Sequence, residues 1–176
     1  ELSAAWAGVR GGELVVGPRP LALEPSRAGM GSRGLALVSR GLLAYSYEST
    51  LERRAKLAIL RVDPATHGLS LVGAPRAIAR GRTAYVQSVS LPSGPASPKT
   101  LTCVQAPGGS GVGKVCGVSA EGRIVGCRDL MWADSEMRAV SGSRLPDGRL
   151  VFAFANAAGE PYYQVLGAED SGMEDA

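Results

Sequence analysis

A pattern of two apolar residues followed by glycine recurs along this chain and constrains its fold more than any other feature. The pattern occurs at Val15-Val16-Gly17, Leu71-Val72-Gly73 and Ile124-Val125-Gly126, at intervals of 56 and 53 residues. The first two copies run on into Pro18-Arg19 and Pro75-Arg76. Repeats at this spacing are typical of arrays in which similar supersecondary units stack on one another.

Nearly every apolar segment is short and bounded by turn residues, which is typical of strands. The 24 glycines and 11 prolines suit many strands joined by tight turns. We therefore predict an all-β protein with little helix. The expected strands cover residues 13–17, 35–38, 42–47, 56–62, 69–72, 84–90, 100–105, 114–119, 123–127, 138–143, 149–155 and 162–166.

These strands group into three four-stranded antiparallel repeats within a single domain, residues 12–167. The units cover about residues 28–80, 81–133, and 134–167 plus 12–24, because 13–17 matches the last strand of the other two units. We expect 13–17 to lie beside 162–166 and so to close the C-terminal repeat. Residues 1–11 form an N-terminal arm, and residues 168–176 form a tail with four acidic and no basic residues.

The repeats resemble those of β-propellers, in which a hairpin such as Arg144–Arg149 joins the inner strand of a blade to the second strand. The resemblance covers roughly residues 12–167 and implies a fold rather than a function. Propellers have about four to eight blades, so three units would need a second copy of the chain or further blades in a longer precursor. A β-trefoil, which also has three repeats of four strands, is the alternative.

Three cysteines are the most informative polar positions. We expect the turn at 107–111 to place Cys103 opposite Cys116, and the turn at 120–123 to place Cys116 opposite Cys127. A cross-strand disulfide in either pair and a cluster of buried thiols both fit this arrangement. A metal site fits less well, because three ligands in line on a sheet make a poor tetrahedron and no histidine is nearby. No cofactor is expected.

Charge and motifs exclude several classes of function. The net charge is +3 and the basic residues are scattered, so we expect no nucleic-acid binding. No apolar run reaches the ~18 to 20 residues of a membrane-spanning helix. The single histidine, His67, lies in a turn without a nucleophile motif, and the glycine-rich run 107–113 lacks the ending of a phosphate-binding loop. We therefore expect no enzyme.

The first function class is a non-catalytic structural or interaction module. It would dock on a larger assembly as a soluble peripheral subunit, for instance of an organellar membrane complex such as a photosystem. The candidate docking residues are Trp6 in the arm, and Glu52, Arg53 and Arg54 in an exposed charged loop expected at 48–56. The expected partners are proteins, among them a second copy of this chain, with peripheral association to a membrane as an option.

A start at Glu1 rather than methionine fits either leader removal or a fragment of a longer protein. With leader removal, the organelle lumen or the extracellular space would be the expected location. The second function class is a carbohydrate-binding propeller lectin or a sialidase-like protein. Tyr45 and Phe152 occupy equivalent repeat positions, but the middle unit has Thr102 or Cys103 there, which counts against several equal sugar sites.

Overall fold

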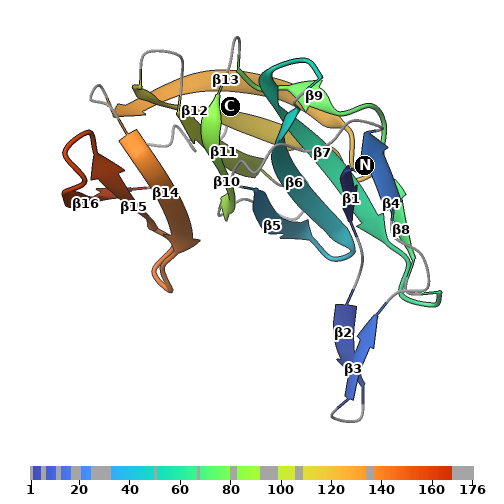
Figure 1. Cartoon of the computed structure of the whole chain (residues 1–176). Coiled ribbons are helices and arrows are strands. Elements are labelled where there is room, and N and C mark those ends of the chain that lie inside the picture. The colour runs from blue at the N-terminus through green and yellow to red at the C-terminus, as the bar shows by residue number, and fades with distance from the viewer. Residues whose placement is uncertain are drawn as a thin grey trace.

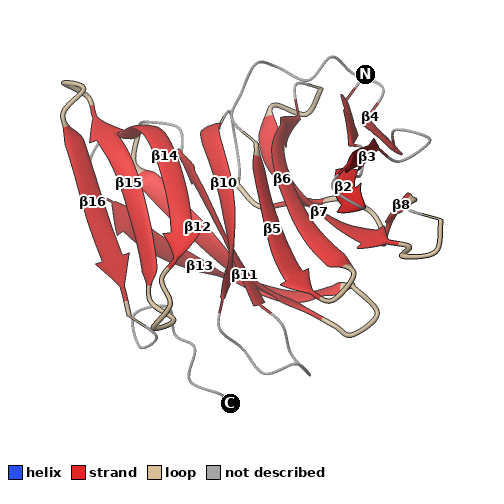
Figure 2. Ribbon diagram, turned by 90° about the horizontal axis from the view of Figure 1, so that it is seen from below, coloured by secondary structure: helices blue, strands red, loops and turns tan. Residues whose placement is uncertain are grey.

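The chain forms a stack of antiparallel sheets (Figures 1 and 2). The computed structural model describes residues 2–4, 7–10, 13–16, 21–24, 33–49, 51–66, 68–79, 83–91, 99–105, 109–133 and 137–167. These residues form sixteen strands and no helix, so the all-β prediction is confirmed. In this part of the chain no helix is therefore present that could span a membrane.

Three main sheets contain most of the strands, and consecutive strands are neighbours in each of them except at β9, which pairs with β7. The first sheet contains β5 (Gly34–Ser39), β6 (Leu42–Ser49), β7 (Arg54–Val62), β8 (Leu69–Leu71) and β9 (Arg76–Ala77). The second contains β10 (Ala84–Leu91), β11 (Lys99–Gln105), β12 (Gly111–Val118) and β13 (Ile124–Ala133). The third contains β14 (Met137–Arg144), β15 (Leu150–Asn156) and β16 (Pro161–Leu166).

The outermost strand of the first sheet is split. Both β8 and β9 pair with β7, β8 at Leu60–Val62 and β9 at Lys56 and Leu57. Residues 72–75 connect the two short strands, and the chain leaves the regular edge after Val72, with Gly73 at a φ of 72°. This positive φ suits glycine, and it allows the chain to bend outward between the two paired segments.

The predicted closure by residues 13–17 is wrong. Instead, β3 (Glu13–Val16) pairs with β2 (Ala7–Arg10), and the third sheet has three strands among the described residues. Only two residues, both glycine, separate β2 from β3 in the sequence. Closing so short a loop costs less conformational entropy than pairing with a strand near the other end of the chain.

The rest of the N-terminal region lies beside the first sheet. The strands β1 (Leu2–Ala4) and β4 (Leu21–Glu24) pair with each other. Leu21 and Leu23 of β4 pack against a cluster of side chains on one face of the first sheet. The buried members of this cluster are Tyr45, Tyr47, Ala58 and Leu60. The β4 strand therefore contributes to the first sheet's packing rather than to the unit at 134–167.

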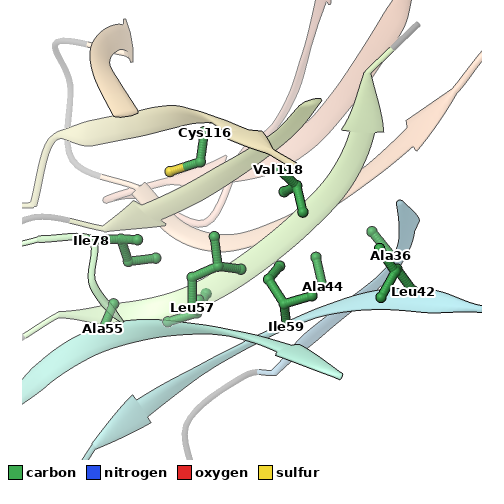
Figure 3. Close-up of a cluster of buried hydrophobic side chains, with 10 residues drawn as sticks. Ala36, Leu42, Ala44, Ala55, Leu57, Ile59, Ile78, Cys116 and Val118 are labelled. Atoms are coloured by element: carbon green, nitrogen blue, oxygen red, sulfur yellow. The ribbon is translucent and has the colours of Figure 1, made fainter. Parts of the chain in front are cut away.

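Two apolar cores hold the main sheets together. The core between the first and second sheets is shown in Figure 3 and contains Ala36, Leu42, Ala44, Ala55, Leu57, Ile59, Ile78, Val86, Cys116 and Val118. The core between the second and third sheets contains Val89, Leu91, Val115, Met137, Leu150, Phe152 and Leu166. Burial of each large apolar side chain contributes about 1.5–3 kcal/mol, so these cores fix how the sheets stack.

A row of buried hydroxyl groups also crosses from the first sheet to the second. The Ser88 hydroxyl donates to Ser46 Oγ over 2.8 Å, and its oxygen lies 2.8 Å from that of Thr102. Ser46 in turn donates to the carbonyl oxygen of Gly34. Because each of these groups is buried, the hydrogen bonds between them offset the loss of water and fix the lateral position of the sheets.

Candidate functional site

An open groove lies where the split edge of the first sheet meets the hairpin between β12 and β13. We call it the inter-sheet groove. It consists of two adjoining hollows of about 300 Å³ and 560 Å³, which share Val72, Gly73 and Arg123. The smaller hollow is also lined by Ala74, Pro75, Arg76 and Ile124, and the larger by Arg61, Ser70, Leu71 and Glu121. These volumes are in the range of small-molecule sites.

The first wall of the groove comes from the split outer strand. Arg61 of β7 and Ser70 of β8 are directly opposed, so their side chains share one face of the sheet. After β8, the amide of Val72 still donates to the carbonyl oxygen of Ile59 over 2.8 Å. The bend at Gly73 then carries Pro75 and Arg76 to the rim of the smaller hollow.

The second wall is the tip of the β12–β13 hairpin. A Cβ on Gly122 would lie 3.0 Å from Leu42 and 3.1 Å from Val72, so this turn packs directly on the first sheet. Gly122 has a φ of 87°, a conformation that L-residues rarely adopt. Arg61 Nη2 donates to the carbonyl oxygen of Glu121 over 2.6 Å and fixes the tip from the other side. These contacts fix the position of the second wall relative to the first.

Hydrogen bonds within the tip orient the carboxylate of the groove. The Ser119 hydroxyl donates to Glu121 Oε2 over 2.7 Å, and its oxygen accepts the backbone N–H of Arg123 over 3.2 Å. The Ser119 hydrogen bond is the main cause of a lowered Glu121 pKa, and the charges of Arg123 and Arg61 lower it further. Glu121 is therefore ionised at neutral pH and accepts hydrogen bonds without donating them.

Positive charge exceeds negative charge in the groove. Its lining contains three arginines and one glutamate. Two exposed arginines outside the groove have carboxylate partners: Arg54 pairs with Glu52, and Arg149 with Asp147. Within the described part of the chain, no ion pair involves Arg61, Arg76 or Arg123. The groove thus offers more hydrogen-bond donors than the protein itself uses.

A disulfide holds the hairpin that forms the second wall. Cys116 and Cys127 are directly opposed, as the turn at 120–123 predicts, and they form a disulfide with Cα atoms 4.1 Å apart. Cys116 is fully buried in the core between the first two sheets. The bond closes the loop whose tip carries Glu121 and Arg123, so it restricts the unfolded chain and keeps this wall paired.

The expected pairing of Cys103 with Cys116 is wrong. Cys103 lies opposite Gly113, and Cys116 lies opposite Thr100, so the register differs by three residues. The reason is that β12 begins at Gly111, within the glycine-rich run expected to be a loop. A strand can include glycines when its backbone groups find partners on both sides, as they do here in β11 and β13. The three cysteines therefore do not form one row.

The predicted docking residues Glu52, Arg53 and Arg54 do not line the groove. The long loop expected at 48–56 is instead a short connection, since β6 extends to Ser49 and β7 begins at Arg54. Glu52, Arg53 and Arg54 are exposed, and Glu52 forms ion pairs with Arg54 and Lys56. Their docking role stays a prediction. Trp6 and His67 lie outside the described residues.

The two aromatic residues at equivalent repeat positions are not available to a ligand. Tyr45 is buried beneath β4, and Phe152 is buried between the second and third sheets. Burial raises the pKa of Tyr45. Neither ring therefore offers the exposed face on which a sugar could stack.

The repeated motif of two apolar residues and a glycine contributes to the groove. The charged residues of the groove that lie beside this motif were not identified from the sequence. Leu71, Val72 and Gly73 of the second copy line the groove, as does Ile124 of the third. The signals for the missed residues were the Pro75-Arg76 pair after the second copy and Glu121-Gly122-Arg123 before the third. Without the stacking of the sheets, nothing indicated that these segments meet.

Comparison with known proteins supports a propeller-type fold. No family model matches the chain. No curated protein matches it either. Two similar solved structures are of an asparagine-to-glutamine mutant of Aleuria aurantia lectin, one with alpha-methyl-L-fucoside and the other with Fucalpha1-6GlcNAc. Both have 13% sequence identity and a TM-score of 0.55, and the likeness covers 94% of this chain.

The chain spans about half of those lectin chains, 51% and 52% of their lengths. At this identity the likeness shows the fold alone. That fold is an all-β arrangement of several antiparallel sheets, as in the Aleuria lectin, which is a β-propeller. The propeller-like prediction therefore accounts for the structure better than the trefoil alternative.

Proposed function

We propose that this protein is a non-catalytic carbohydrate-binding module and that its saccharide site is the inter-sheet groove. The observation that carries the proposal is the groove itself. It places guanidinium groups, a carboxylate and an apolar wall together, on a fold similar to that of a lectin solved with fucosides bound. The likeness extends over 94% of this chain.

The chemistry of the lining suits a saccharide. Neighbouring hydroxyl groups of a sugar both donate and accept hydrogen bonds, so a site for them needs fixed donors and fixed acceptors. Arg61 and Arg123 supply donors, and Glu121, oriented by Ser119, supplies an acceptor. Val72, Pro75 and Ile124 form an apolar surface against which the C–H groups of a ring can pack. Sites for small ligands commonly combine an apolar lining with a few well-placed polar groups.

Binding is favoured over hydrolysis by the number of carboxylates. Most glycoside hydrolases use a pair of carboxyl groups, one as the acid and one as the base or nucleophile. Sialidases instead use a tyrosine as the nucleophile. Among the described residues that line the groove, Glu121 is the single carboxylate and there is no tyrosine. This supports the lectin interpretation over the sialidase-like one. The structural-subunit interpretation receives no comparable support, because its candidate residues lie outside the groove or outside the described residues.

A glycan array followed by calorimetric titration tests the proposal. We expect the protein to bind at least one class of saccharide on the array. Glu121→Gln should weaken that binding at least tenfold, because a hydrogen bond to a charged group contributes about 1.5–3 kcal/mol. The matched control is Glu160→Gln, which alters an exposed glutamate in the turn between β15 and β16. A protein that binds no saccharide, or a Glu121→Gln variant with unchanged affinity, would contradict the proposal.

A further inference from the structure

We infer that the saccharide bound in the inter-sheet groove is acidic, with a carboxylate or sulfate group that occupies the smaller hollow between Arg76 and Arg123. This inference rests on the proposed carbohydrate-binding function and specifies its ligand. The two hollows differ in charge. The larger one combines Arg61, Arg123 and Ser70 with Glu121, whereas the smaller one has two arginines and no acidic residue in its lining.

The two arginines reach the smaller hollow from different sheets. Arg76 belongs to β9 of the first sheet, and Arg123 lies directly before β13 of the second. Both are exposed, and neither forms an ion pair within the described residues. Two positive charges that border one hollow repel each other, and an anion between them would remove that repulsion. A guanidinium group also matches a carboxylate or sulfate with paired hydrogen bonds.

A neutral sugar would leave the charge of Arg76 without a counter-charge in the smaller hollow, and that of Arg123 compensated only in part, by Glu121. A guanidinium has five N–H donors and no acceptor, so the ligand must supply the acceptors. Sugar hydroxyls are weaker acceptors than an anionic oxygen, because hydrogen bonds to ionised groups are shorter and stronger. The larger hollow is different, since Glu121 there can accept from hydroxyl groups. The groove thus divides into a place for an acidic group and a place for a hydroxyl-bearing ring.

The test compares an acidic saccharide with its neutral counterpart. The probes are a hyaluronan tetrasaccharide, the same oligosaccharide after reduction of its carboxylates to alcohols, alpha-methyl-L-fucoside, and inorganic sulfate. Affinities are measured by calorimetry at two salt concentrations for the wild-type chain and for Arg76→Gln, Arg123→Gln and Arg40→Gln. Arg40 is an exposed arginine in the turn between β5 and β6, and its substitution is the matched control.

We expect the acidic tetrasaccharide to bind at least tenfold more tightly than its reduced form. Arg76→Gln and Arg123→Gln should each remove most of this preference, and Arg40→Gln should leave it unchanged. Higher salt should weaken the acidic probe more than the neutral ones.

Several outcomes would overturn the inference. If the reduced tetrasaccharide or the fucoside binds as tightly as the acidic probe, the ligand is neutral and the proposed function stands without the inference. Equal loss of the preference in Arg40→Gln would show a response to overall charge rather than to this hollow. Sulfate that binds as tightly as the tetrasaccharide, with the same dependence on Arg76 and Arg123, would identify a simple anion site. If none of the saccharides binds, and the glycan array also detects none, the proposed function fails as well.

Discussion

At the scale of single residues, the close approach of the first two sheets depends on Gly34. A Cβ at this position would lie 2.3 Å from the backbone nitrogen of Ser88 and 2.6 Å from Ser46 Oγ. Real side chains do not come this close to a backbone atom, so any substitution must push β5 away from β10. The same movement would break the hydrogen bonds between the buried hydroxyls of Ser46 and Ser88.

We therefore expect Gly34→Ala to lower the free energy of unfolding by about 3 kcal/mol, the upper end of the range for overpacking. Gly126→Ala is the matched control, because Gly126 is also in a strand but a Cβ added to it would have no atom within 4 Å. This control should change stability by less than about 0.5 kcal/mol. Urea denaturation of the two variants measures both effects. Equal stabilities would show that the sheets are further apart than these distances require.

A second prediction at this scale follows from the lowered pKa of Glu121. Its folded-state pKa lies below the ordinary value of 4.5, mainly because the ionised carboxylate accepts a hydrogen bond from Ser119. The stability that this contact contributes is present above pH 4.5 and is lost as the pH falls through the lowered value. Glu121→Gln should therefore be less sensitive to pH in this range than the wild type. An NMR titration of the Glu121 carboxyl that gave a pKa of 4.5 or higher would refute this account.

At the scale of elements, the disulfide and the hairpin that it closes determine the second wall of the groove. The chain has three cysteines, and Cys116 and Cys127 are joined. Thiol titration in denaturant without reductant should therefore find one reactive thiol per chain. Three would mean that the bond does not form in the protein.

Loss of this bond should destabilise the fold. We expect Cys127→Ala to reduce the free energy of unfolding by about 2–4 kcal/mol, the usual contribution of a disulfide. Addition of a reductant should lower the stability of the wild type to a similar extent and leave the variant unaffected. Unfolding curves with and without reductant provide this comparison, and a reductant effect on Cys127→Ala would point to another cause.

The N-terminal strands contribute differently to the stability of the fold. The β2–β3 hairpin pairs within itself and extends away from the sheets in Figure 1, whereas Leu21 and Leu23 of β4 pack on the first sheet. We expect replacement of residues 7–16 by a short Gly-Ser linker to change stability by less than about 0.5 kcal/mol. Leu23→Ala should cost roughly 1–2 kcal/mol, less than a fully buried leucine because Leu23 is half-buried. Thermal melts that ranked these variants in the opposite order would restore a structural role for the hairpin.

The sequence predicted the positions of elements better than their partners. Each of the twelve expected strands overlaps a strand of the structure, because apolar runs and turn residues act locally. The predicted register of Cys103 was wrong because Gly111 and Gly113 belong to β12. The sequence pattern does not reveal which glycines of a run belong to a strand. The predicted partner of β3 was wrong because the similarity between repeats favoured the third sheet, whereas the short separation between β2 and β3 determines the pairing.

The groove could not be predicted from the sequence for a related reason. Arg61 and Arg76 come from two strands of the first sheet and Arg123 from the turn before β13 of the second, and they meet because those sheets stack. The packing of Gly122 against Leu42 and Val72 brings the hairpin tip to the split edge. Nothing local to any of these residues distinguishes them from arginines on an ordinary solvated surface.

At the scale of the whole molecule, the stack of sheets positions the site. Apolar cores on both faces of the second sheet keep the β12–β13 hairpin in place, and its tip then meets the first sheet at the groove. The fold is similar to that of a lectin. The groove is bordered by three arginines of this chain, Arg61, Arg76 and Arg123. The central claim is that saccharides bind at this junction between sheets.

Amide chemical-shift mapping tests this claim most directly. The isotope-labelled protein would be titrated with the saccharide that binds most tightly on the array. The largest shifts should occur in Ser70–Arg76 and Ser119–Ile124, which form the two walls of the groove. The amides of β14, β15 and β16 should shift little, because the third sheet does not contribute to the lining. Shifts centred on the third sheet, or on Leu51–Arg54, would contradict the assignment of the groove as the binding site.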